Sequence, residues 1–87
     1  MLAQQEIDRI RDFITHNDGF TIIAHVSPDG DTLGSSLALL GMLLQMGKAA
    51  EAVCSDRIPP QFAALPLAET IRLPKEAVGY AHAIAVD

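Results

Sequence analysis

The chain has 87 residues, which allows one domain at the lower end of ordinary domain sizes. Its formal net charge of −5 and its pI near 4.9 argue against a broad nucleic-acid-binding surface, which would be basic. A small phosphorylated substrate held through metal ions is compatible with this charge. Hydrophobic residues make up 49% of the chain, as in a piece of a larger α/β domain whose parallel strands are covered on both faces.

The sequence carries no sign of secretion or membrane insertion. There is no basic segment followed by a long apolar one, and no apolar run reaches the ~18–20 residues of a membrane span. One cysteine, Cys54, permits no internal disulfide and has no His or Cys neighbour at ligand spacing. We therefore expect a cytoplasmic protein in which Cys54 is a small buried hydrophobic residue.

The first elements are predicted to be a helix, a turn and a strand. Residues 1–17 read as an amphipathic helix, because Ile7, Ile10 and Ile14 recur at helical spacing along one face. The run from Asn17 to Gly19 is a stop-and-turn signal. Residues 20–25 are apolar enough to form a central strand.

Residues 32–46 predict a second helix with an unusually apolar surface. Leu33, Leu37, Leu40 and Leu44 form one stripe, and further apolar residues widen it. We expect this helix to be buried on more than one side. The methionines on it, Met42 and Met46, are expected to fill the core. Gly47 is expected to end the helix in a left-handed conformation.

The remainder alternates strands with short helical segments. Strands are predicted over 49–55, 70–73 and 80–86, with short helical turns after residue 60 and at Pro74. Asp56 follows the strand 49–55 and is interpreted as a polar loop residue. This order predicts an α/β domain of three layers, with a mainly parallel sheet and right-handed crossovers.

The turn between the first strand and the second helix holds the chemistry. His25 ends the strand, and Asp29 and Asp31 flank Gly30, which can turn the chain so that both carboxylates point one way. Two carboxylates held together repel unless a cation lies between them, and imidazole with carboxylates suits Mn²⁺, Zn²⁺ or Fe. Asp31 also stands where a helix N-cap is expected, so a capping role is the alternative to metal binding.

Small residues open the second helix. Gly34, Ser35 and Ser36 leave its first turns accessible, so a phosphate could approach the free N–H groups there. Close packing of helix on sheet also requires small residues. Both interpretations stay open at this point, and they are compatible with each other.

The segment 25–39 closely resembles the first motif of the DHH-family phosphoesterases, His-x-x-Pro-Asp-Gly-Asp-x-x-Gly-Ser. It looks most like the branch with nanoRNases/pAp-phosphatases, cyclic-dinucleotide phosphodiesterases and exopolyphosphatase-like proteins. The family's second motif is a strand ending in Asp, which residues 83–87 match. The third motif, Asp-His-His, the fourth-motif Asp and the substrate domain are absent from residues 1–87. The resemblance thus implies the N-terminal portion of a Rossmann-like phosphoesterase domain, truncated and with little activity alone.

The resemblance also implies a set of site residues. His25 and Asp29 would hold one Mn²⁺, Asp31 a second and Asp87 both, with Mg²⁺ as an alternative metal. The implied substrate is a short oligoribonucleotide, pAp or a cyclic dinucleotide. Alternatives are a manganese pyrophosphatase or exopolyphosphatase-like hydrolase, and a non-catalytic phosphate-binding fragment that uses Gly34, Ser35 and Ser36. Because the last strand would expose an apolar edge, we also expect a homo-oligomer.

Overall fold

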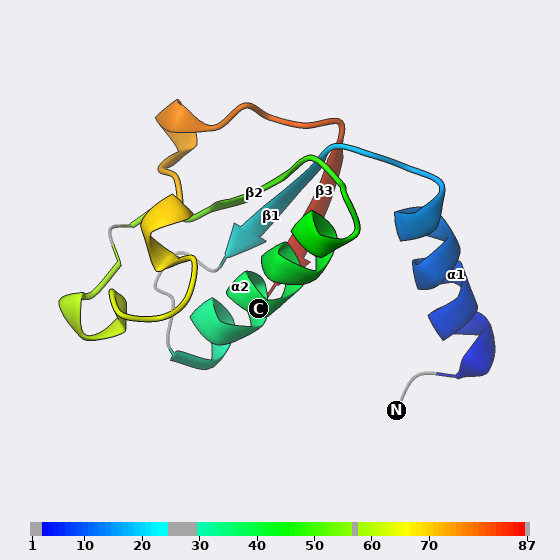
Figure 1. Cartoon of the computed structure of the whole chain (residues 1–87), viewed down its shortest axis with the longest axis horizontal. Coiled ribbons are helices and arrows are strands. Elements are labelled where there is room, and N and C mark those ends of the chain that lie inside the picture. The colour runs from blue at the N-terminus through cyan, green and yellow to red at the C-terminus, as the bar shows by residue number, and fades with distance from the viewer. Residues whose placement is uncertain (1–2, 25–29, 57, 87) are drawn as a thin grey trace.

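A three-stranded parallel sheet in the order β2-β1-β3 is the centre of the chain, in a computed structural model that describes residues 3–24, 30–56 and 58–86. Residues 30 and 31 are described through their backbone alone. The strands are β1 (Phe20–Ala24), β2 (Ala50–Val53) and β3 (His82–Val86), and the helices are α1 (Gln4–Thr15) and α2 (Gly30–Gln45). Three 3-10 turns, η1 (Pro60–Phe62), η2 (Ala68–Thr70) and η3 (Pro74–Glu76), connect β2 to β3 (Figure 1). The prediction of an α/β fold with a parallel sheet is confirmed.

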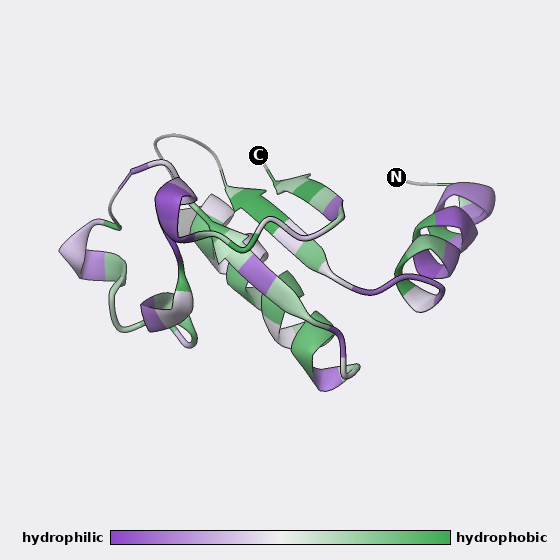
Figure 2. Ribbon diagram, turned by 90° about the horizontal axis from the view of Figure 1, so that it is seen from above, coloured by the Kyte–Doolittle hydropathy of each residue, from purple (hydrophilic) through white to green (hydrophobic). Residues whose placement is uncertain are grey.

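Helix α2 covers one face of the sheet and contributes several residues to the core. Four of its leucines are buried: Leu33, Leu37, Leu40 and Leu43. The last three form one core cluster with Phe20 and Ile22 of β1, which are fully buried, and with Ala52 of β2. Figure 2 shows how hydrophobic the ribbon is along β1 and α2. Burial of each such side chain stabilises the fold by roughly 1.5–3 kcal/mol.

The prediction that α2 is buried on more than one side is wrong for the described part of the chain. Met42, Leu44 and Met46 expose 56%, 44% and 48% of their surface. The sequence shows that α2 is apolar nearly all round, but the structure places a sheet on one side of it only. Met42 and Met46 are therefore surface residues and not core residues.

The opposite face of the sheet has little cover. Ile23 of β1 is 45% exposed, and Ala83 and Ala85 of β3 are also exposed there. Thr21 and Glu51 on this face are buried, each exposing less than a tenth of its surface. The helices in the described ranges lie on one face, so these residues build two layers of the expected three.

Helix α1 is the most loosely attached element. Its apolar residues Ile7, Ile10 and Phe13 remain between 38% and 49% exposed. Figures 1 and 2 both show α1 displaced to one side of α2 and the sheet. The ring of Phe13 makes edge contacts with Phe20 and His82, with centroids 5.7 and 5.4 Å apart, and this anchors the C-terminal end of α1.

The predicted helix end at Gly47 and the predicted strand over 70–73 have different outcomes. Gly47 follows α2 with a φ of +78°, as a left-handed helix end requires, so that prediction is confirmed. The strand expected over 70–73 is wrong, since it is reduced to one bridge between Val53 and Arg72. Thr70 belongs to η2, and Pro74 has no N–H with which to extend the pairing.

Within the described ranges, no helix is both long and apolar enough to cross a membrane.

Candidate metal and phosphate site

The carboxyl ends of the three strands meet at one edge of the sheet. The parallel register pairs Ile23 with Val53 and Ala24 with Val86. His25 follows Ala24 and Asp87 follows Val86 in the chain, so two predicted metal ligands continue from paired positions of neighbouring strands. His25, Asp29 and Asp87 themselves lie outside the described residues, and their convergence stays a prediction.

Asp31 is found inside α2. The helix begins at Gly30, so Asp31 lies in its first turn and not at the N-cap position that the sequence suggested. Its backbone is therefore close to the free N–H groups of the helix, where the dipole favours negative charge. Metal binding by Asp31 stays a prediction, because the structure describes the backbone of this residue and not its side chain.

The three small residues of α2 divide into two groups. Ser36 is 1% exposed and faces the core, whereas Gly34 and Ser35 face solvent. A Cβ added at Gly34 would meet nothing within 4 Å. The two interpretations of this segment thus fit different residues: the packing interpretation fits Ser36, which is buried, and the ligand interpretation fits Gly34 and Ser35, which are exposed.

The Ser36 hydroxyl is an exception to the usual satisfaction of buried polar groups. Its Oγ is buried and has no hydrogen-bond partner among the described residues. Such a group costs about 1–3 kcal/mol, so a buried polar atom of this kind calls for an explanation. Ser36 lies in the second turn of α2, at the end of the helix that follows the predicted ligand segment.

Two hollows are lined in part by residues of α2 or of the segment after β2. One, of about 340 Å³, is lined by α2 from Gly34 to Gly41 and by Leu65, Pro66 and Leu67. The other, of about 290 Å³, lies beyond β2, and its polar lining includes Asp56, Arg72 and Glu76. Asp56 is exposed there, as a loop residue should be. No cluster of three or more His, Cys, Asp or Glu side chains suited to a metal occurs within the described ranges, so the metal prediction depends on residues 25, 29, 31 and 87.

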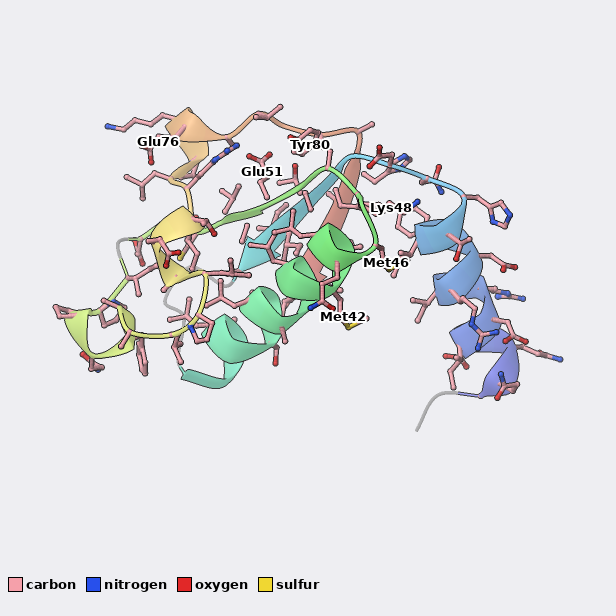
Figure 3. The ribbon with its side chains drawn as sticks, in the orientation of Figure 1. Met42, Met46, Lys48, Glu51, Glu76 and Tyr80 are labelled. Carbon is pink, nitrogen blue, oxygen red and sulfur yellow. The ribbon has the colours of Figure 1, made fainter. Side chains whose placement is uncertain are left out.

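Sequence reasoning missed Glu51 in β2, which accepts more hydrogen bonds than the other carboxylates whose side chains the structure describes. It is 3% exposed, and its two oxygens accept four hydrogen bonds at 2.8–3.0 Å, from Thr21 Oγ1, Arg72 and the backbone N–H groups of Val78 and Gly79. Figure 3 shows it beneath the segment that leads to Tyr80. Burial raises the pKa of the Glu51 carboxyl, but the four donors more than offset this and lower the pKa to about 2. The available signal was a lone acid within an apolar strand.

Comparison with known proteins finds similarity to solved structures. No family model matches the chain, and no curated protein matches it. The chain is similar to the crystal structure of an exopolyphosphatase-related protein from Bacteroides fragilis, with 34% sequence identity and a TM-score of 0.78. The match covers 82% of this chain and 21% of that protein, so the chain spans about a fifth of its length. This similarity supports the exopolyphosphatase-like side of the resemblance found in the sequence.

Proposed function

We propose that this chain supplies the first part of the active site of a metal-dependent phosphoesterase of the DHH family. One observation carries the proposal: Ala24 and Val86 are paired on neighbouring parallel strands, and each is followed by a predicted ligand. Open α/β sheets bind ligands at this edge. The similarity to an exopolyphosphatase-related protein supports a phosphoester or phosphoanhydride as the bond that is hydrolysed.

The donor set suits the metal. One imidazole, from His25, and three carboxylates, from Asp29, Asp31 and Asp87, are ligands that Mn²⁺ accepts readily, and Mg²⁺ would use the carboxylates. In this proposal His25 and Asp29 hold one ion, Asp31 holds a second and Asp87 contacts both. Paired metal ions of this kind activate a water molecule and stabilise charge on the phosphate that it attacks.

The start of α2 would receive the phosphate. Gly34 and Ser35 are exposed in the second turn of α2, so they leave this face of the helix open beside an anion bound to the free N–H groups of the first turn. Ser36 is buried on the core side of the helix and is left out of this proposed phosphate contact. The substrate class that we propose is a short oligoribonucleotide, pAp or a cyclic dinucleotide.

A second candidate is a hydrolase of inorganic polyphosphate or pyrophosphate. The name of the related crystal structure favours it, since that protein is described as exopolyphosphatase-related. The two candidates use the same metal chemistry and differ in whether the substrate carries a nucleoside. Competition between pAp and tripolyphosphate for the Mn²⁺-loaded chain, followed by titration calorimetry, separates them. Tight phosphate binding without added metal would instead favour a non-catalytic phosphate-binding module.

The test of the metal site is Asp29→Asn, with Asp12→Asn as its control. Asp12 is an exposed carboxylate on α1, remote from the carboxyl edge of the sheet. We expect Asp29→Asn to weaken Mn²⁺ binding by about 100-fold or more, because asparagine keeps the shape and loses the charge. The control should bind like the parent chain. Equal Mn²⁺ affinity in the parent and Asp29→Asn would reduce Asp29 to a turn residue and overturn the proposal.

A further inference from the structure

Three successive backbone N–H groups converge on two side chains where the chain enters β3. Val78 N donates to Glu51 Oε1 and Gly79 N donates to Glu51 Oε2, both at 2.9 Å. Tyr80 N donates to Thr21 Oγ1 at 2.9 Å. The Thr21 hydroxyl in turn donates to Glu51 Oε2 at 2.8 Å, so all three N–H groups serve one hydrogen-bonded pair.

This arrangement is a backbone nest filled by the protein's own carboxylate. Consecutive N–H groups form such anion-binding concavities when one residue adopts a left-handed conformation, and Gly79 has a φ of +75°. Glu51 and Thr21 are buried and face each other in the register of β1 and β2. The segment 78–80 is therefore bound to the two strands that precede it in the chain.

The side chains of β3 do not fix its register by themselves. His82, Ile84 and Val86 face the core, and Ala83 and Ala85 face outward. A shift by one residue would reverse the two faces and is excluded by this alternation. A shift by two residues keeps the larger side chains on the core face, so the alternation does not exclude it. The observed register of β3 must therefore depend on contacts other than the alternation of its side chains.

We infer that the pair Glu51–Thr21 sets the register of β3 on β1. Each of the three N–H groups has one acceptor at hydrogen-bonding distance, and a two-residue shift of the segment would move all three away from their acceptors. Hydrogen bonds to a charged group are about twice as strong as neutral ones, and this pair supplies two of them to the backbone of the segment. Glu51 and Thr21 are thus positioning residues.

The register matters at the other end of the strand. Pairing of Ala24 with Val86 decides where Asp87 follows relative to His25. Two residues of β-strand span about 7 Å, whereas metal-ligand distances tolerate only ~0.2 Å. The consequence for metal binding rests on the proposed function. The register role itself does not, because it follows from contacts at the amino end of the sheet.

Disulfide trapping tests the register directly. Ile23 and Ala85 are paired and both are exposed, so cysteines at these positions should cross-link, because adjacent parallel strands lie ~4.8 Å apart. Cysteines at Ile23 and Ala83 are diagonal, at roughly 8 Å, and should cross-link only after a two-residue shift. Cys54→Ala is included in each chain so that the buried thiol does not compete.

The decisive variants are Thr21→Val and Glu51→Gln, with Thr21→Ser and Glu69→Gln as controls. Valine keeps the shape of Thr21 and removes both hydrogen bonds, serine retains the hydroxyl, and Glu69 is an exposed acid. We expect Thr21→Val to lower the ratio of the 23–85 to the 23–83 cross-link by about tenfold, and Glu51→Gln by more, since its bonds carry charge. Both controls should keep the parent ratio.

Two outcomes overturn the inference. An unchanged cross-link ratio in Thr21→Val and Glu51→Gln would do so, as would an equal loss of both cross-links, because that pattern means simple destabilisation. Mn²⁺ titration of the same variants tests the link to the proposed site. If the parent chain binds no Mn²⁺, the proposed function fails while the cross-link ratio still decides the register. If Mn²⁺ binds equally to the parent and to a register-shifted variant, the link to the site fails.

Discussion

The two ends of the parallel sheet are built differently. At the amino end, side chains satisfy the backbone of distant segments. Asp18 Oδ1 accepts from Gly19 N and Ala49 N at 2.8 Å, and Lys48 Nζ donates to the carbonyls of Thr15 and Asn17 at 3.1 and 2.8 Å. Figure 3 shows Lys48 reaching toward the end of α1. At the carboxyl end, Ser36 Oγ lacks a partner among the described residues, and Gly34 and Ser35 face solvent.

This difference suggests that the amino end of the sheet contributes to stability and that the carboxyl end contributes to ligand binding. At the amino end, these polar groups make hydrogen bonds within the protein, and those bonds hold neighbouring segments in place. At the carboxyl end, the described small residues Gly34 and Ser35 face solvent. Mutations at the two ends should therefore fall into different classes, affecting folding at one end and ligand binding at the other.

The largest effect is expected for Glu51→Ala. The substitution leaves Arg72 and three hydrogen-bond donors without their acceptor, and breaking a buried ionic network by removing one partner costs about 3–5 kcal/mol. Urea unfolding followed by circular dichroism measures this loss. A cost below about 1 kcal/mol would show that the amino end is not the stabilising end.

Acid should remove much of the same contribution without any mutation. The pKa of Glu51 is about 2 in the folded chain against an ordinary 4.5, so its stabilisation is present above pH 4.5 and is lost as the pH falls toward 2. The difference corresponds to about 3 kcal/mol. Hydrogen bonds from Ala49 N and Gly19 N lower the pKa of Asp18 and act in the same direction. Urea unfolding between pH 2 and pH 6 should show a much shallower dependence in Glu51→Gln, and an equally steep one would assign the acid sensitivity elsewhere.

A smaller effect is expected for Gly79→Ala, at about 1–2 kcal/mol. No atom lies within 4 Å of the added Cβ, so the cost arises from the positive φ and not from a clash. Gly41→Ala in α2 is the matched control, since its Cβ would make an ordinary contact of 3.6 Å with Leu67. That control should gain about 0.5–1 kcal/mol from helix propensity. Thermal unfolding of both variants checks the contrast, which fails if the two shift in the same direction.

The smallest effect is expected for Lys48→Met, at about 0.5–1 kcal/mol. The substitution keeps the apolar stem and removes two hydrogen bonds to the end of α1. Hydrogen exchange of the amides in α1 is the sensitive measurement, because α1 has no fully buried residue and depends on such links. Faster exchange confined to α1 is the expected result, and uniform acceleration over the sheet would contradict it.

How far the sequence predicted this molecule depends on the range of the interactions. Strands and helices with strong periodicity, such as β1 and α2, were predicted closely because their signal is local. The exposure of Met42 and Met46 was not, because a pattern shows how apolar a helix is and not how many neighbours it has. Glu51 was missed for a related reason: its partners lie 21 to 30 residues away, and nothing near it in sequence shows where its charge is satisfied.

For the candidate site, the residues were easier to predict from the sequence than their arrangement. Its residues were predicted from a short motif, and the structure supports the part of the prediction that depends on topology, namely that the strands preceding His25 and Asp87 end at one edge. The burial of Ser36 and the exposure of Gly34 and Ser35 could not be predicted from the sequence. Three consecutive small residues do not indicate which of them faces the sheet.

The hydrogen bond from Tyr80 to Thr21 spans 59 residues, and this span has a kinetic consequence. Strand β1, helix α2 and strand β2 are consecutive and can assemble early, since their contacts are comparatively local. Pairing of strand β3 with β1 requires closure of a much longer loop. The entropy cost of this closure comes before the gain from strand pairing, so this step slows folding. Until β3 pairs, the Glu51 carboxylate stays hydrated, and the strand edge that later receives β3 is open to other chains. We therefore expect refolding to become more prone to aggregation as the protein concentration rises, and this vulnerability should end when segment 78–80 reaches the carboxylate.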